Sequence, residues 1–91
     1  MDVREAVHTA KQHLRDVFSD EELFNVGLEE VDYDGVAWRI TLGFSRSWDR
    51  KGPLVAALAE SRLERSYKVL RILDETGEME SLKDRILQTR Q

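Results

Sequence analysis

The side chains of this 91-residue chain that are able to do chemistry are two histidines and a run of carboxylates. His8 and His13 are five residues apart, whereas two metal ligands on one face of a helix need a spacing of three or four. We therefore do not expect them to share a metal ion. Neither has an acid or a nucleophile paired with it, so a general base is not indicated. Both are expected at the boundary or surface of a helix.

Four carboxylates follow one another closely at Glu29, Glu30, Asp32 and Asp34. They lack the ligand spacing and the internal glycine of a calcium loop. In an extended strand residues 30, 32 and 34 share one face, and we expect that face to be solvated. The carboxylates therefore predict a charged surface and not a metal site.

Nucleophilic and phosphate-binding patterns are also missing from the sequence. Ser45 and Ser47 have no partner base, and Gly52-Pro53 has the composition of a turn rather than of a phosphate-binding loop. The absence of cysteine excludes disulfides, thiolate metal sites and cysteine nucleophiles. The sequence thus predicts no catalytic residue, no metal and no cofactor, and hence a protein that is not an enzyme.

A helix is predicted over residues 2–18. Asp2 is a favourable N-cap, and Glu5 three residues later completes a capping box. Apolar residues then recur with the spacing of one buried helical stripe. They are Val3, Ala6, Val7, Ala10, Leu14, Val17 and Phe18.

Two hairpins follow, each with its own turn chemistry. Asp34-Gly35 predicts a type I′ turn, which needs positive φ at both central residues. Alternation from Val36 to Phe44 predicts a half-buried strand after it. The slip at Glu29-Glu30 before it predicts either a bulge or a loss of one-sided burial. Asp74-Glu75-Thr76-Gly77 predicts the second turn. The expected strands are about 24–33, 36–45, 65–74 and 78–85.

The resulting order, α-β-β-(loop)-β-β, predicts a single α+β domain over residues 1–91. Its N-terminal helix is expected to pack on a four-stranded antiparallel sheet, because no other element is available to cover the apolar face. Residues 46–64 form a long connection, in which Leu54 to Ala59 after Pro53 fits either a short helix or a loop. Residues 88–91 are expected to fray.

Charge is unevenly distributed along a chain of net charge −4. Residues 1–34 hold three basic and ten acidic side chains (3 − 10 = −7), whereas residues 39–71 hold eight basic and three acidic ones (8 − 3 = +5). Such polarity suits an electrostatically steered partner or attraction between copies of the chain. No apolar run is long enough to span a bilayer and no signal peptide is recognisable, so we expect no membrane and a cytoplasmic location.

The segment from Tyr67 to Met79 resembles the closing motif of PepSY-type domains: an aromatic, alternating apolar residues, Asp, then Thr-Gly-Glu and an apolar residue. The early helix, and a hairpin whose second strand carries Trp38, are similar in order. The resemblance implies a PepSY-like or cystatin-like α+β topology. It does not extend to protease inhibition, because PepSY domains are mostly exported or membrane-tethered and this chain adds the basic connection 46–64. The segment from Leu42 to Asp49 also resembles small bacterial proteins without an assigned function.

The predicted function is a protein-protein interaction or regulatory module that uses the connection 46–64. Tryptophan and arginine are typical of interface anchors, and the predicted contacts are Arg46, Trp48, Arg50 and Lys51. The alternative for Trp48 is that it folds back and caps the edge of the sheet. The partner is another protein or a second copy of the chain. The alternative is a nucleic-acid accessory that binds through a basic strip over residues 39–71 with aromatic side chains nearby.

Overall fold

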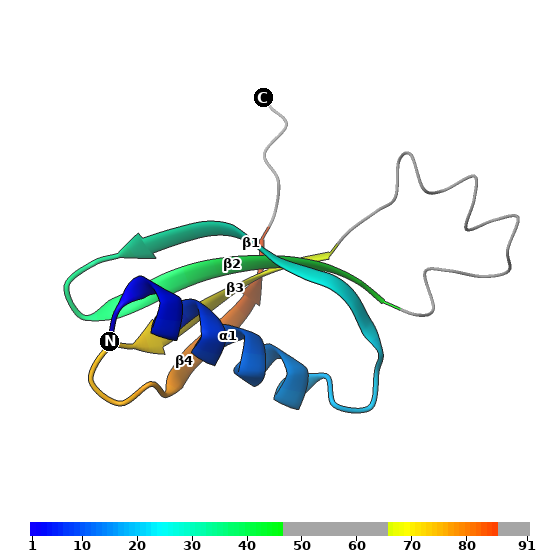
Figure 1. Cartoon of the computed structure of the whole chain (residues 1–91), viewed down its shortest axis with the longest axis horizontal. Helices are drawn as coiled ribbons and strands as arrows, with labels where there is room; N and C mark the ends of the chain where they lie inside the picture. Colours follow the sequence, from blue (N-terminus) through cyan, green and yellow to red (C-terminus); the bar gives the residue numbers. More distant parts are fainter. Residues whose placement is uncertain (47–65, 86–91) are drawn as a thin grey trace, which may run out of the picture.

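The computed structural model describes residues 1–46 and 66–85, in which one helix precedes a four-stranded antiparallel sheet (Figure 1). The helix is α1 (Val3–Val17). The strands pair in chain order as β1-β2-β3-β4, so the predicted α+β class, the order of elements and the antiparallel meander are confirmed. The strands are β1 (Leu23–Tyr33), β2 (Ala37–Arg46), β3 (Ser66–Leu73) and β4 (Met79–Asp84).

The N-terminal end of α1 is capped as the sequence predicts. The Asp2 carboxylate accepts the Glu5 backbone N–H at 2.8 Å, and the Glu5 carboxylate accepts the Asp2 N–H at 2.9 Å. This capping box satisfies donors that have no partner inside the helix. At the other end the Phe18 N–H donates to the Leu14 carbonyl oxygen at 3.1 Å. Neither the length nor the apolar content of α1, the single helix among the described residues, would let it cross a membrane.

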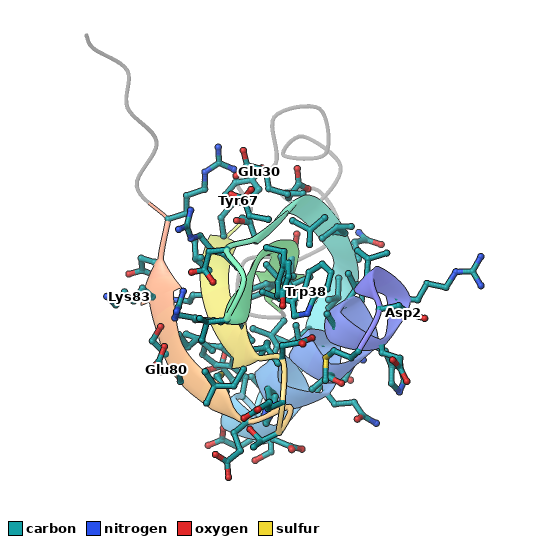
Figure 2. The ribbon with its side chains drawn as sticks, turned by 90° about the vertical axis from the view of Figure 1, so that its left-hand side faces the viewer. Asp2, Glu30, Trp38, Tyr67, Glu80 and Lys83 are labelled. Carbon is teal, nitrogen blue, oxygen red and sulfur yellow. The ribbon has the colours of Figure 1, made fainter. Side chains whose placement is uncertain are left out.

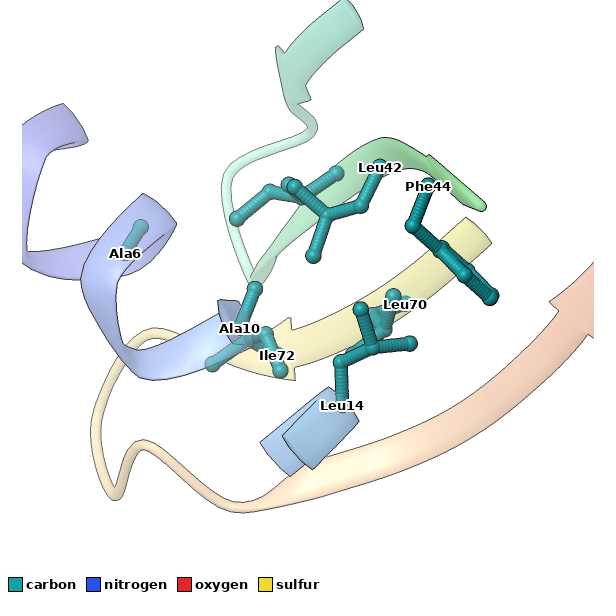
Figure 3. Packing of buried hydrophobic residues seen from close by; sticks show 8 residues of the cluster. Ala6, Ala10, Leu14, Leu42, Phe44, Leu70 and Ile72 are labelled. Atoms are coloured by element: carbon teal, nitrogen blue, oxygen red, sulfur yellow. The ribbon is translucent and has the colours of Figure 1, made fainter. Parts of the chain in front are cut away.

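The core consists of side chains from α1 and the two central strands (Figure 3). Ala6, Ala10 and Leu14 follow one another at a spacing of four, which places them in a row on one side of the helix. All three are fully buried, and the two alanines leave room for the helix backbone to lie close to the sheet. The other members are Ile40, Leu42 and Phe44 of β2 with Leu70 and Ile72 of β3.

The buried stripe of α1 is shorter than the apolar pattern predicts. Val7 and Phe18 are only partly buried beside the cluster, and Val3 and Val17 are 43% and 50% exposed. The seven-residue buried stripe was therefore wrong at its margins. Val3 and Val17 are each seven residues from Ala10 and therefore point in nearly the same direction as it. They are exposed because they are the first and last residues of α1.

The first hairpin turn differs from the predicted type I′. Gly35 has a φ of 97°, but Asp34 does not have a positive φ. The Asp34 carboxylate instead accepts the backbone N–H groups of Val36 and Ala37, each at 2.9 Å. Val36 thus belongs to the turn and is 61% exposed, so its predicted place on the buried face of the strand was wrong. An aspartate that binds its own turn amides competes with the two-residue turn that Asp-Gly otherwise favours.

The predicted bulge in β1 is confirmed, because its register with β2 shifts between Leu28 and Glu30. A second, unpredicted shift lies between Phe24 and Gly27, where Asn25 has a φ of 55°. Asparagine tolerates this left-handed conformation better than most residues. The strand at this edge of the sheet is therefore interrupted twice.

The second turn carries glycine where the chain needs a left-handed residue. Gly77 has a φ of 76°, and its N–H donates to the Leu73 carbonyl oxygen at 2.8 Å. The Leu73 N–H donates to the Glu78 carbonyl oxygen at 2.9 Å, which closes the hairpin. The turn predicted at residues 74–77 is thus present.

Replacement of Leu14 tests whether the buried row of α1 stabilises the fold. We expect Leu14→Ala to lower the free energy of unfolding by about 2–5 kcal/mol, because it leaves a cavity between helix and sheet. Urea unfolding followed by circular dichroism measures this difference. Val17→Ala is the matched control on the exposed side of the same helix, with an expected change within about 0.5 kcal/mol. Equal effects of the two substitutions would contradict the packing described here.

Candidate functional site

A groove lined mainly by apolar side chains lies between α1 and the edge strand β1. Its volume is about 370 Å³. Val3 and Val7 are one helical turn apart on α1, and Leu28 of β1 lies opposite them. Arg4, His8 and Lys11 complete the lining from the helix side, at the i, i+4 and i+7 positions of a single helical face.

The groove exists because burial falls abruptly from β2 to β1. Leu28 pairs with Leu42, and Val31 pairs with Ile40, so the paired side chains share the face of the sheet that α1 occupies. Leu42 and Ile40 are fully buried, whereas Leu28 is 44% exposed and Val31 is also exposed. One strand spacing of about 4.8 Å therefore separates the core from solvent-exposed apolar side chains.

An aromatic and carboxylate cluster closes the same face at the hairpin end of the sheet. The rings of Tyr33 and Trp38 stack with centroids 4.6 Å apart. The Asp74 carboxylate accepts the Trp38 indole N–H at 2.9 Å and the Met1 amino group at 3.0 Å, with the Tyr33 hydroxyl at 3.5 Å. Figure 2 shows Trp38 on the side of the sheet that carries α1, whereas Glu30 and Tyr67 lie on the other side.

These hydrogen bonds have an electrostatic consequence for Asp74. The Trp38 indole N–H, followed by the Met1 amino group, holds the pKa of the Asp74 carboxyl below its usual range, because both donors favour the ionised form. Desolvation and then the nearby Asp74 charge raise the pKa of the Tyr33 hydroxyl. The cluster therefore fixes the turn at residues 74–77 against the first hairpin.

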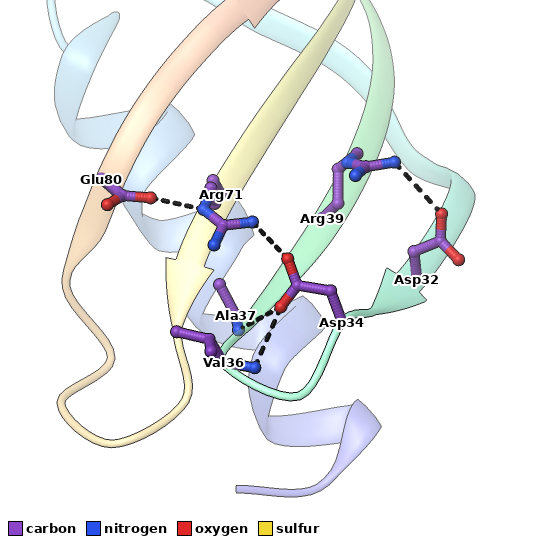
Figure 4. Close-up of polar contacts among 7 residues, drawn as sticks. All are labelled: Asp32, Asp34, Val36, Ala37, Arg39, Arg71 and Glu80. Atoms are coloured by element: carbon purple, nitrogen blue, oxygen red, sulfur yellow. Dashed lines mark hydrogen bonds and ion pairs between the residues drawn. The ribbon is translucent and has the colours of Figure 1, made fainter.

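The opposite face of the sheet carries a network of ion pairs (Figure 4). Arg39 and Arg71 lie directly opposite each other on β2 and β3, an arrangement of like charges that is unfavourable by itself. Carboxylates offset it: Asp32 lies 3.4 Å from Arg39, while Arg71 contacts Asp34 at 2.6 Å and also Glu80. The Arg71 guanidinium, helped by the Ala37 and Val36 N–H groups, lowers the pKa of Asp34 well below its usual range.

The predicted basic strip over residues 39–71 is not continuous where its side chains are described. Arg39 and Arg71 are on the face away from α1, but Lys68 pairs with Leu42 in register and lies on the helix side. Its ammonium contacts Asp84 and sits 5.8 Å from the Phe18 ring centroid. All three described cations of the strip are thus neutralised by a carboxylate.

The histidines and carboxylates form no arrangement for catalysis among the described residues. The His13 ring donates from Nε2 to the Gly77 carbonyl oxygen at 3.0 Å and joins α1 to the second turn. His8 is exposed beside the groove. No group of three His, Cys, Asp or Glu side chains in residues 1–46 and 66–85 is placed to hold a metal ion.

The predicted contact residues are not brought to this groove by any described feature. Arg46 ends β2, and its side chain is not described. Trp48, Arg50 and Lys51, together with the rest of the connection to residue 64 and the tail 88–91, lie outside the described residues. Their role stays a prediction.

The groove residues were missed because the sequence assigned them to the core. Val3 and Val7 fit the apolar stripe of the helix, and Leu28 fits the alternation of the first strand. No signal in the sequence says which side chains of the first strand the helix leaves exposed. Arg4 and Lys11 have the charge of an exposed helix surface. Because the sequence does not show which strand lies beside them, they indicated no binding site.

Comparison of the chain with family models, curated proteins and solved structures found no match. The PepSY-like or cystatin-like relationship therefore stays a prediction. What the chain does has to be inferred from its own geometry.

The cluster around Asp74 predicts a pH-dependent stability. Because the folded-state pKa of Asp74 is lowered, its stabilisation is present above the ordinary carboxyl pKa of 3.8 and is lost as the pH falls through the folded value. We expect Asp74→Asn to lower the urea midpoint at about pH 7, and the difference from the unsubstituted chain to shrink below about pH 4. Glu75→Gln, at the exposed neighbouring position, is the control. A difference that does not vary with pH would contradict this assignment.

Proposed function

We propose that this chain is a non-enzymatic protein-binding domain whose groove between α1 and β1 holds a segment of another protein. The observation that carries the proposal is the exposure of Leu28 beside the groove, directly next to its buried neighbour Leu42. Val3 on the helix and Val31 further along β1 extend the exposed apolar surface. Contiguous apolar surface bordered by charged residues is typical of protein interaction sites.

The dimensions of the groove suit side chains of a peptide segment. Its volume of about 370 Å³ is at the lower end of the range for binding pockets. Full burial of a leucine or valine side chain contributes about 1.5–3 kcal/mol. Folding leaves Val3, Leu28 and Val31 partly exposed, and a bound partner would bury the rest of their apolar surface. Such a site favours a few apolar anchors over a large flat contact.

Charge favours a protein over nucleic acid as the partner. Phosphate binding needs cations that are free to replace counterions, whereas Arg39, Lys68 and Arg71 each contact a carboxylate. The net charge of −4 opposes nucleic acid as well. The described part of the basic strip over residues 39–71 therefore does not support the nucleic-acid alternative.

Self-association through the edge of the sheet is also disfavoured. Pairing of β1 with a second β1 would bring Glu30 and Asp32 of the two copies close together on one face. The two register shifts in β1 interrupt the regular edge that another strand would need. A partner that contacts the side chains of the groove avoids both obstacles. The connection 46–64 remains a second predicted contact region, but the proposal does not depend on it.

A cross-linking experiment tests this proposal. A photoreactive amino acid placed at position 28, in cells that express the chain, should give a discrete adduct with a protein that mass spectrometry identifies. The same group at position 36 is the control, because Val36 is exposed in the distant first turn. Adducts of equal yield at both positions, or adducts with nucleic acid, would contradict the proposal.

Affinity for the identified partner then provides the quantitative test. We expect Leu28→Gln to weaken binding by about tenfold, because it removes an apolar contact without adding a charge. Val36→Gln should leave the affinity unchanged, and circular dichroism should show both variants folded. If Leu28→Gln unfolds the domain, Val3→Ser on the helix side replaces it. Unchanged affinity in the folded groove variant would overturn the proposal.

A further inference from the structure

We infer that the groove between α1 and β1 selects an acidic amphipathic segment, with apolar side chains between Val7 and Leu28 and carboxylates against Arg4 and Lys11. The inference rests on the proposed function and specifies the chemistry of the partner. It begins from the composition of the groove wall. Of its six lining residues, three are apolar, Arg4 and Lys11 are cationic, His8 is titratable, and none is acidic.

The groove cations differ from those on the other face of the sheet in having no carboxylate partner. Among the described residues, Arg4 and Lys11 take part in no ion pair. On the face away from α1, by contrast, Arg39, Arg71 and Arg85 each contact a carboxylate. The acidic excess of residues 1–34 is thus partly engaged on that face, while the groove keeps its positive charges.

The spacing of the groove residues fits a ligand that is itself amphipathic. Arg4, His8 and Lys11 run along α1 in one row, and Val3 and Val7 run beside them. A segment lying along the groove would meet apolar side chains on its inner side and positive charges on the side of the helix. Charge complementarity of this kind mainly sets specificity and the rate of association.

The same geometry argues against a second copy of the chain as the occupant. A two-fold symmetric contact of groove with groove would bring Arg4 and Lys11 of one copy toward the same cations of the other. A second groove also offers no carboxylate among its lining residues. The complementary surface therefore has to come from a different, acidic sequence.

Two synthetic peptides test the inference with the intact chain. Both have about 16 residues and identical leucines at the i, i+3, i+4 and i+7 positions, and their polar positions are all glutamate in one and all lysine in the other. We expect the glutamate peptide to shift the amide NMR signals of Val7, Lys11 and Leu28, with an affinity about tenfold above that of the lysine peptide at low salt. Added salt should reduce this difference.

Charge reversal on the protein supplies the matched test. The double variant Arg4→Glu and Lys11→Glu should reverse the preference between the two peptides, whereas Lys83→Glu, an exposed charge on β4, should leave it unchanged. Circular dichroism verifies folding, and the single variant Lys11→Gln replaces the double variant if that does not fold. The inference is supported if the double variant reverses the peptide preference and Lys83→Glu does not.

The remaining outcomes distinguish this inference from the proposed function. Equal binding of both peptides at the groove overturns the charge preference but leaves a protein-binding groove in place. No shift of groove signals with either peptide at about 1 mM overturns the inference, and the effect of Leu28→Gln on the cross-linked partner then decides the proposed function separately. If phosphatidylserine vesicles abolish the NMR signals of the groove residues and the glutamate peptide does not affect them, the groove binds an anionic lipid surface instead.

Discussion

The structure depends on the fact that one helix cannot cover four strands. An α-helix with its side chains is about 10 Å wide and neighbouring strands are about 4.8 Å apart, so one helix shields two or three strands. Here the row Ala6, Ala10 and Leu14 is buried against β2 and β3. On β1, Leu23 and Val26 pack against this cluster, whereas Leu28, Val31 and Tyr33 stay exposed. The groove is therefore a direct result of how much apolar surface a domain of this size has to cover.

The two faces of the sheet divide the charge of the chain between them. The face away from α1 is a network in which each described arginine contacts a carboxylate, and these pairs relieve the direct opposition of Arg39 and Arg71. Exposed pairs of this kind contribute little stability each, but together they neutralise the face. The helix side of the groove has no such compensation. A partner is thus offered one apolar surface bordered by positive charge.

Local signals in the sequence were sufficient for most of the fold. The capping box at Asp2 and Glu5, the alternation from Trp38 to Phe44, and the glycine at position 77 each act over a few residues, and each led to the observed element. The type predicted for the first turn was wrong because the Asp34 carboxylate accepts hydrogen bonds from two backbone N–H groups of the turn. Local patterns of this type cannot report competition between a side chain and the main chain.

The candidate site was less accessible to such reasoning because it depends on how the helix lies across the sheet. Leu28 and Leu42 have the same residue type and face the same side, yet one is exposed and the other is buried. The pattern of apolar residues is identical for both cases. The predicted contacts at Arg46, Trp48, Arg50 and Lys51 were chosen from composition, and they concern a part of the chain beyond the described side chains.

The contacts at the two turns brace one end of the sheet on both of its faces. Asp74 joins the second turn to Trp38 on one face, and Arg71 joins β3 to Asp34 on the other, so the two hairpins are cross-braced at this end from both sides. Local opening of a protein starts where such contacts are few. Backbone amides at residues 37–38 and 72–74 should consequently be protected from hydrogen exchange, because opening of either turn requires contacts on both faces of the sheet to break.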